Sequence, residues 1–393
     1  MVLSNNDGVV VSRSNESKAM GIGMCTPFFK IRHLAEKGLL AVRSSNYTMY
    51  GDISARVMSI LAETAPRLEV YSIDEAYMDF TGVRPELVPI LCHGIVEKVR
   101  RWTGIPVSVG VAPTKTLAKV ANHFAKNYKG YKGVCVIDSE AKRLKALELT
   151  PIGDVWGIGW RSAPKLRSVG VATALDFVSR PEAWVRKRMG VAGVRTWSEL
   201  QGSRMVEEEN NEKRKSICVS RSFAGPITDY DELSARISDY AGKCAEKLRS
   251  EGSAARTVSV FARTDLCRED LPRYSQGASL RLDVPANDSP SIIGSALKAL
   301  RMIYKPGYKY KKAGVVMEDI IEASSIQQTL FDFDPEARQK DNALSSVMDK
   351  FNKDGKNVLR LATQRPGHYS DGMRHEYMSK LYSTDWKQLI EVK

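Results

Sequence analysis

The stretch that decides the fold is residues 68–80, LEVYSIDEAYMDF. Its aromatic and apolar residues are typical of β-strands. Side chains of a regular strand alternate between two faces, but the apolar positions here change parity between Ile73 and Ala76. Such a slip predicts a bulge or tight turn at the two residues concerned, Asp74 and Glu75.

Two adjacent acids in this setting suggest metal chemistry. Phosphoryl and nucleotidyl transfer use two magnesium ions, one for the attacking oxygen and one for the triphosphate, so carboxylates must converge on one point. Asp74 and Glu75 supply such a pair. The alternative interpretation is an acid pair that caps a surface hairpin.

Downstream of the acids, residues 105–126 read IPVSVGVAPTKTLAKVANHFAK. This run predicts a strand, a Pro-Thr break and then a helix with an apolar face. Lys115, Lys119 and Lys126 share another face of that helix. On periodicity alone, these lysines would form a solvated face.

The rest of the chain is organised around these elements. The segment MVLSNNDGVVV at the start predicts a strand pair around an Asn-Asp-Gly turn. Residues from about 151 to 205 have a helical pattern, and residues 207–215 form a charged linker. From about 216 to 320, strand-like runs alternate with two amphipathic helices and predict a small α+β domain. The polar remainder is expected to be partly disordered.

The bulk composition limits the class of protein. A length of 393 residues predicts several domains, and the formal net charge of +13 suits a polyanionic partner such as nucleic acid. The six cysteines are scattered and form no zinc-finger pattern, which favours a reduced cytoplasmic location. No stretch reaches the roughly 20 apolar residues that cross a bilayer.

Residues 72–79, SIDEAYMD, resemble the palm motif of the Y-family DNA polymerases. Further segments of the chain are similar to the UmuC-like branch of that family, namely SNNDG, SNESKAMGIGMCTPFFK, VGVAPTKTLAKVANHFAK, VWGIGWRSAPKL and KSICVSRSF. The resemblance implies an α+β multidomain fold, a right hand with an added little-finger domain. The implied parts are fingers with a remnant of the palm (1–45), palm (46–150), thumb with a helix-hairpin-helix (151–206), linker (207–215), little finger (216–322) and a C-terminal tail (323–393).

The resemblance also implies roles for individual residues. Asp74 and Glu75 become the catalytic ligands of Mg²⁺, and Asn15, Lys18 and Lys126 the triphosphate contacts. Many relatives have Tyr and Arg at the first two of these three positions, and Lys lacks the bidentate fork of Arg.

Other residues are expected to contact DNA or a protein partner. The glycine amides of a helix-hairpin-helix can approach a DNA phosphate, and basic residues among tyrosines suit a template groove. A basic edge strand is the alternative for the last domain. The candidate DNA contacts are Gly157, Gly159, Lys165, Lys215, Arg221, Lys309 and Lys311. A QQTLF peptide, with Gln327, Leu330 and Phe331, looks like the segment that bacterial sliding-clamp ligands insert into an apolar cleft.

The implied function is error-prone translesion DNA synthesis in the SOS response, that is, template-directed addition of deoxynucleotides past damaged bases. The expected substrates are primed damaged DNA and deoxynucleoside triphosphates. The expected protein partners are the sliding clamp, a processed UmuD-type dimer and a RecA-type filament. No membrane partner is expected.

The match breaks at the start of the chain. The family's first palm strand carries an Asp metal ligand and an aromatic gate against ribonucleotides, and residue 1 aligns just after that strand. The resemblance therefore predicts an N-terminal truncation, an incomplete two-metal site and impaired activity. Two alternatives stay open: a metal-dependent nuclease, and a non-catalytic relative that binds DNA and the clamp.

Overall fold

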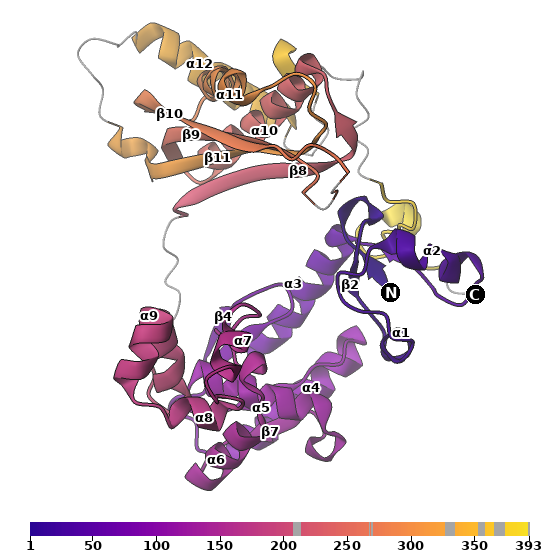
Figure 1. Ribbon diagram of the computed structural model, residues 1–393, viewed down its shortest axis with the longest axis vertical. Coiled ribbons are helices and arrows are strands. Elements are labelled where there is room, and N and C mark those ends of the chain that lie inside the picture. The colour runs from indigo at the N-terminus through magenta and orange to yellow at the C-terminus, as the bar shows by residue number, and fades with distance from the viewer. Residues whose placement is uncertain are drawn as a thin grey trace. The chain divides into compact units, whose positions relative to one another are not determined.

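The computed structural model describes residues 1–206, 214–266, 268, 270–326, 335–352, 358–364 and 374–391, with only the backbone for 335–339. The chain divides into two compact units, coloured by residue number in Figure 1. The first unit comprises Met1–Ser45 and Glu212–Ser379. The second unit comprises Asn46–Asn211 and Lys380–Lys393.

Residues 1–45 form a small N-terminal module within the first unit. Its sheet has the order β2-β1-β3, with strands β1 (Val2–Leu3), β2 (Val10–Ser12) and β3 (Arg43–Ser44). Strand β1 runs antiparallel to β2, as the Asn-Asp-Gly turn predicts, and parallel to β3. A 3-10 turn, η1 (Asn5–Asp7), and two helices, α1 (Asn15–Ala19) and α2 (Phe28–Glu36), complete the module. Its buried apolar side chains are Leu3, Val10, Ile22, Phe28, Leu40 and Val42.

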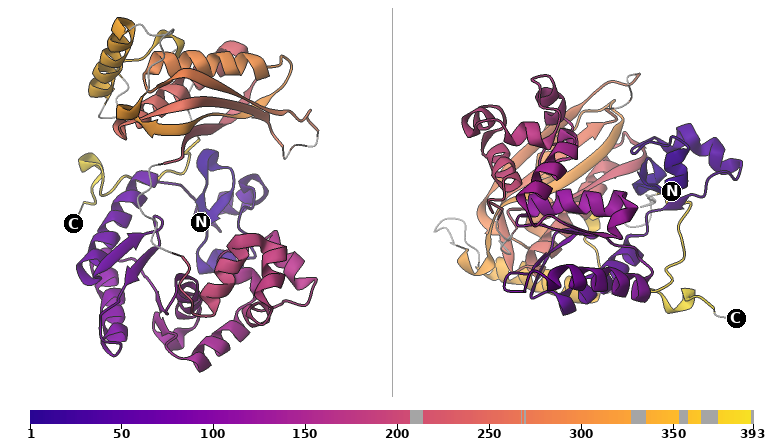
Figure 2. Two further views of the ribbon diagram at one scale, coloured as in Figure 1. Left: turned by 90° about the vertical axis from the view of Figure 1, so that its left-hand side faces the viewer. Right: turned by 90° about the horizontal axis from the view of Figure 1, so that it is seen from below.

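The other large part of the first unit is a four-stranded antiparallel sheet of order β10-β9-β11-β8. The predicted strand-like runs form β8 (Ser216–Ile227), β9 (Ser253–Thr264), β10 (Ser275–Ala286) and β11 (Tyr310–Glu322). Helices α10 (Tyr230–Ser250) and α11 (Ser289–Ile303) cover one face of this sheet (Figures 1 and 2). A large apolar core fills the space between the helices and the sheet.

The polar segment after residue 322 contains some regular structure among its described residues. It contains η4 (Ala323–Ser325), helix α12 (Pro335–Asn352) and a short turn, η5 (Ala362–Gln364). Ser345 and Met348 of α12 are buried, because the helix packs against α11.

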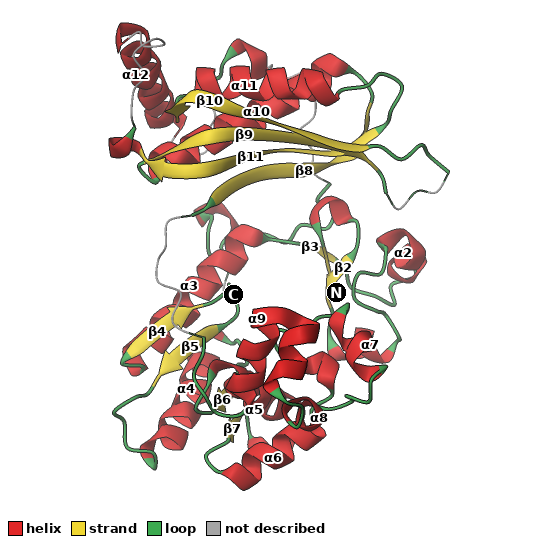
Figure 3. Cartoon of the chain, turned by 60° about the vertical axis from the view of Figure 1, so that its left-hand side comes forward, coloured by secondary structure: helices red, strands yellow, loops and turns green. Residues whose placement is uncertain are grey.

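The second unit contains two small sheets among helices (Figure 3). Strands β4 (Arg67–Val70) and β5 (Ala76–Asp79) pair antiparallel, and strands β6 (Val109–Val111) and β7 (Val134–Val136) pair parallel. Helices α3 (Tyr47–Thr64) and α4 (Leu87–Thr103) pack against each other, and α4 also contacts β6 and β7. Apolar clusters under the two sheets therefore share this helical layer.

The remainder of the second unit is helical. Helix α5 (Lys115–Asn127) supplies the apolar face that the sequence predicts, with η2 (Lys129–Tyr131) after it. The elements that follow are α6 (Glu140–Leu149), η3 (Ile152–Asp154), α7 (Ser162–Arg167), α8 (Ala174–Val178), α9 (Glu182–Leu200) and, near the C-terminus, η6 (Trp386–Gln388). One apolar core joins α5 to α6 through α9. Among the described helices, none combines the length and the apolar character needed to cross a membrane.

Candidate active site

The acid pair lies in the tight turn between β4 and β5. The strands pair up to Val70 and Ala76, and the backbone N–H groups of Tyr71 and Ser72 both donate to the carbonyl of Glu75, at 3.0 and 2.9 Å. The turn explains the change of parity seen in the sequence, since the chain reverses between residues 70 and 76. Asp74 and Glu75 are both exposed.

Each acid has one close polar neighbour. The hydroxyl of Ser72 donates to Oδ1 of Asp74 at 2.7 Å, and Nζ of Lys119 lies 2.6 Å from Oε2 of Glu75. Within the described residues, no group of three or more His, Cys, Asp or Glu side chains could hold a metal ion. Mg²⁺ commonly binds through one or two carboxylates and completes its shell with water and substrate phosphates. The pair therefore fits Mg²⁺ by donor type.

Lys119 lies among three aromatic rings that no sequence pattern links to it. Its Nζ is 5.1 Å from the ring centre of Tyr71, 6.0 Å from Tyr77 and 5.7 Å from Trp156. The rings also contact one another, with centroids 5.8 to 6.3 Å apart. We call Tyr71, Tyr77, Lys119 and Trp156 the aromatic cluster. It links the acidic turn to α5 and to the residues around Trp156 and Gly157, which we call the Gly157 segment.

Tyr77 is the most perturbed member of the aromatic cluster. Burial raises the pKa of its phenol well above the usual range, and the nearby Glu75 carboxylate raises it further. Its buried hydroxyl has no hydrogen-bond partner among the described residues. Lys115, one turn before Lys119, contacts Glu69 at 2.6 and 2.7 Å and lies 5.2 Å from the Tyr77 ring.

The lysines of α5 thus divide into two kinds. Lys115 and Lys119 face the β4–β5 hairpin and pair with its acids. Lys126, predicted to contact a triphosphate, is exposed in the last turn of α5. It belongs to the same unit as Asp74 and Glu75, so this unit contains three of the five predicted catalytic and nucleotide-binding residues.

Asn15 and Lys18 belong to the first unit. They lie one turn apart in α1, and Nζ of Lys18 donates to Oδ1 of Asn15 at 3.4 Å. Ser14 caps this short helix by accepting from the N–H of Ser17 at 3.3 Å. Both predicted triphosphate contacts are exposed.

The two glycines of the predicted helix-hairpin-helix differ in their surroundings. Gly157 has a φ of +91°, and a Cβ placed on it would lie 2.6 Å from Oγ1 of Thr196. Gly159 has no atom within 4 Å of such a Cβ, and its carbonyl accepts from Ser162 and Ala163 at the start of α7. The backbone conformation and the contact with Thr196 therefore require glycine at position 157. At position 159 the space beside the backbone is open. Lys165 is exposed on α7.

Of the tyrosines that alternate with basic residues in the segment 304–311, Tyr304 and Tyr308 are half-buried and Tyr310 is buried. Tyr310 is fully buried, and its ring contacts Tyr304 and Tyr274 with centroids 5.7 and 6.1 Å apart. The ring of Tyr308 lies 4.6 Å from that of Tyr274. The expectation of aromatic groove residues is wrong for Tyr310, because the register shift between Tyr310 and Lys312 places its side chain in the core. Burial raises the pKa of its phenol.

The basic candidates of the first unit have unequal exposure. Lys215 and Lys309 are exposed, and Arg221 is half-buried on β8. Nζ of Lys311 donates to the carbonyls of Phe223 and Ala224 at 2.7 and 3.3 Å, at the register shift between β11 and β8. Lys311 thus has an intramolecular role that the sequence pattern did not indicate. The clamp candidates Gln327, Leu330 and Phe331 lie outside the described residues.

Solved structures show which class of fold this is. A Y-family DNA polymerase chimera of Dbh and Dpo4 matches with a TM-score of 0.62 and 24% identity, over 80% of this chain and 88% of the chimera. A post-insertion binary complex of Dbh DNA polymerase matches with a TM-score of 0.52 and 23% identity, over 81% and 92% of the respective chains. The architecture is that of the Y-family DNA polymerases, as predicted.

Sequence relatives give the family. Protein UmuC of Salmonella typhimurium strain LT2 is 39% identical over all of this chain and 94% of its own length. Protein ImpB of Salmonella typhimurium is 38% identical, over 99% of this chain and 92% of its own length. DNA polymerase IV of Staphylococcus aureus strain JH9 is 27% identical, over 84% and 90% respectively.

Family models match three segments of the chain. Residues 1–123 match the impB/mucB/samB family, residues 214–330 its C-terminal domain, and residues 342–392 a domain of unknown function, DUF4113. The chain belongs to the impB/mucB/samB family. The predicted family is confirmed, and the relatives support the predicted enzyme class, a DNA-directed DNA polymerase.

Proposed function

We propose that this chain is an error-prone, DNA-directed DNA polymerase that extends primers past damaged template bases during the SOS response. The observation that carries the proposal is the tight turn of the second unit, which presents Asp74 and Glu75 side by side at the end of a hairpin. Family membership and UmuC-like relatives over the full length of the chain support the same reaction.

In this proposal, Asp74 and Glu75 hold Mg²⁺. When bound, the ion supplies positive charge for the triphosphate and helps to activate the attacking oxygen. The protein's own part begins with Glu75, which must exchange Lys119 for the metal as its closest cation. Asp74 is kept in place by the Ser72 hydroxyl, which leaves its other carboxylate oxygen available.

Three further side chains are proposed to bind the incoming nucleotide. Asn15, Lys18 and Lys126 are exposed and polar or basic, as contacts to a triphosphate must be. Each lysine offers a point charge without the planar fork of Arg, so the phosphates are gripped by charge more than by geometry. A looser grip suits a site that accepts distorted base pairs.

The template-primer duplex is proposed to meet exposed backbone and basic groups. Gly159 and Lys165 lie at the start of α7 and within it, where an open amide and a cation can approach a phosphate. Lys215, Arg221 and Lys309 add positive charge in the first unit, in keeping with the net charge of +13. Family resemblance adds a sliding clamp, a UmuD-type dimer and a RecA-type filament as proposed partners.

Primer extension tests the proposal. A labelled primer on an undamaged template, and one ending before an abasic site, are incubated with Mg²⁺ with or without deoxynucleoside triphosphates. Elongation that requires the triphosphates and continues across the abasic site is the expected result. Shortening of the primer that does not depend on triphosphates would instead identify a metal-dependent nuclease.

A second candidate is a non-catalytic DNA-binding protein. It is favoured by one observation, the absence of a third acidic ligand near Asp74 and Glu75 among the described residues. Binding of primed DNA without elongation, at any Mg²⁺ concentration, would support this candidate.

A further inference from the structure

The segment that contains residues 374–378 lies against the N-terminal module, although more than 300 residues separate them in sequence (Figure 1). The segment makes a turn in which the N–H of Met378 donates to the carbonyl of His375. His375 and Tyr377 are half-buried, whereas Arg374, Glu376 and Met378 are exposed. We call residues 374–378 the C-terminal strap.

Ser44 of β3 binds the strap through its backbone N–H and its hydroxyl group. Its N–H donates to the carbonyl of Tyr377 at 3.0 Å, and its hydroxyl oxygen accepts from the N–H of Tyr377 at 3.1 Å. Ser44 is fully buried, so these bonds are shielded from water. The backbone of Tyr377 is therefore satisfied on both sides by one residue of the module.

Asp7 joins the same network with both carboxylate oxygens. Oδ1 accepts from the hydroxyl of Ser44 at 2.7 Å, and Oδ2 accepts from the N–H of Glu376 at 2.8 Å. Asp7 is only 8% exposed, and a buried carboxylate is costly unless its oxygens are hydrogen-bonded. One of these two hydrogen bonds comes from the strap.

Asn6 connects the strap to the large sheet of the same unit. Its Oδ1 accepts from the N–H of Arg374 at 3.2 Å, and its Nδ2 donates to the carbonyl of Ser222 on β8 at 2.8 Å. The backbone of Asn6 has a φ of +61°, a conformation that asparagine tolerates better than most residues. The Asn5–Asp7 turn is thus a junction of the module, the strap and β8.

The strap also contributes to the core of the module. A module of 45 residues with six buried apolar side chains is below the size at which a single core is usually sufficient. Tyr377 packs on this core, with its ring edge-on to Phe28 at 5.5 Å and 85°. Its aromatic ring adds apolar area that residues 1–45 do not supply.

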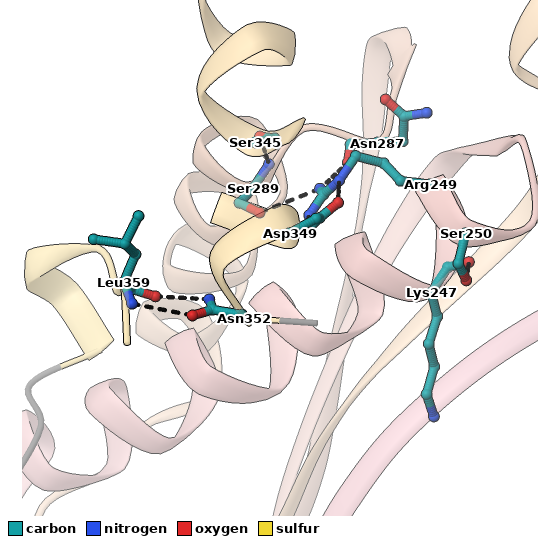
Figure 4. A network of polar contacts seen from close by, with 9 residues as sticks. All are labelled: Lys247, Arg249, Ser250, Asn287, Ser289, Ser345, Asp349, Asn352 and Leu359. Carbon is teal, nitrogen blue, oxygen red and sulfur yellow. Dashed lines mark hydrogen bonds and ion pairs between the residues drawn. The ribbon is translucent and has the colours of Figure 1, made fainter. Parts of the chain in front are cut away.

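A second anchor lies earlier in the same C-terminal region (Figure 4). Asp349 of α12 accepts two hydrogen bonds from Arg249 of α10, at 2.6 and 2.7 Å, and Arg249 also donates to the carbonyl of Asn287 at 2.6 Å. The hydroxyl of Ser345 accepts from the N–H of Ser289 at 3.2 Å. Both anchors fall within residues 342–392, the match to the domain of unknown function.

We propose that this C-terminal domain is an internal brace: α12 fixes it to α10 and α11, and the strap completes the N-terminal module and holds it against β8. The brace thereby positions helix α1, which carries Asn15 and Lys18. The effect on triphosphate binding rests on the proposed function, whereas the effect on the module does not.

Hydrogen exchange of the full-length chain tests the brace directly. Tyr377→Ala removes the ring from the core, and Asp7→Asn replaces one acceptor oxygen with an amide while keeping the side-chain size and a tolerated backbone. Met378→Ala is the matched control, because this neighbouring side chain is 43% exposed. Peptides that cover residues 1–12 and 40–46 should exchange at least tenfold faster in Tyr377→Ala and Asp7→Asn than in the wild type. In Met378→Ala these peptides should exchange at the wild-type rate. Residues 254–262 in β9 should keep their protection in all three.

Steady-state kinetics separates the effect of the brace on the N-terminal module from its effect on triphosphate binding. The KM for the incoming deoxynucleotide should rise at least threefold in Tyr377→Ala, with the affinity for primed DNA unchanged. Unchanged exchange of residues 1–12 and 40–46 in both variants would overturn the brace. Faster exchange with an unchanged KM would confirm the brace and overturn the assignment of Asn15 and Lys18 to the triphosphate.

Discussion

The ammonium of Lys119 lies 2.6 Å from Oε2 of Glu75, so an acid proposed to bind Mg²⁺ is already paired with a cation of α5. The same ammonium lies over the rings of Tyr71 and Trp156. A metal ion that binds Glu75 must compete with this ion pair. Lys119 therefore competes with the metal ion for Glu75, and its effect should be measured as a change in metal affinity.

Lys119→Gln should strengthen metal binding. Exposed ion pairs contribute about 0.2–1 kcal/mol, so loss of the competing cation should lower the Kd for Mn²⁺ by about 1.4- to fivefold. Titration of Mn²⁺ followed by electron paramagnetic resonance measures this without any enzymatic turnover. Lys142→Gln, which breaks the ion pair with Asp138 of the same unit, is the control. An equal Kd for Mn²⁺ in wild type and Lys119→Gln would contradict the proposed competition.

Tyr77→Phe should not destabilise the protein. The buried hydroxyl of Tyr77 has no partner among the described residues, so its removal leaves no hydrogen bond broken. The free energy of unfolding in urea should stay the same or rise by up to about 1 kcal/mol. A loss of more than about 1 kcal/mol would show that this hydroxyl makes a stabilising bond.

The same substitution should change the dependence of stability on pH. Burial raises the pKa of Tyr77 in the folded protein above its value of about 10 in the unfolded chain. Below pH 10 both states keep the phenol proton; above it the unfolded state loses the proton first, so the folded state is disfavoured as pH rises. Unfolding measured from pH 8 to 11 should show a steeper loss in wild type than in Tyr77→Phe. Parallel curves would contradict the raised pKa.

The two glycines of the Gly157 segment should respond differently to alanine. Gly157→Ala combines a positive φ with a close contact to Thr196 and should cost about 1–3 kcal/mol of stability. Gly159→Ala should leave the free energy of unfolding unchanged and weaken binding of primed DNA, because only the approach of a phosphate is obstructed. Thermal unfolding and fluorescence anisotropy measure the two effects. Unchanged DNA affinity in Gly159→Ala would argue against a phosphate contact there.

The acidic turn could be predicted from the sequence because its signal is local. The apolar positions change from odd to even between Ile73 and Ala76, which indicates the reversal of the chain. The eight residues 72–79 identify the family. The strands of the four-stranded sheet are predictable for the same reason, since each has its own composition and alternation. The boundaries of the six predicted parts of the chain and the roles of the site residues stay predictions.

The aromatic cluster and the strap could not be predicted, since both depend on contacts between distant segments. Trp156 meets Tyr71 only because α5 and the following segment pack beside the hairpin. Tyr377 reaches Phe28 from near the opposite end of the chain. The burial of Tyr310 could not be predicted from the alternation of β11 either, because the register shift between Tyr310 and Lys312 breaks that alternation.

The central claim is that Asp74 is a metal-binding residue of a DNA polymerase. Primer extension by Asp74→Ala, compared with Asp138→Asn as an exposed acid elsewhere in the same unit, tests it most directly. We predict triphosphate-dependent extension by the wild type and by Asp138→Asn. In Asp74→Ala the extension rate should fall at least a hundredfold, whereas the affinity for primed DNA should be unchanged. Extension by Asp74→Ala at the wild-type rate would contradict the claim.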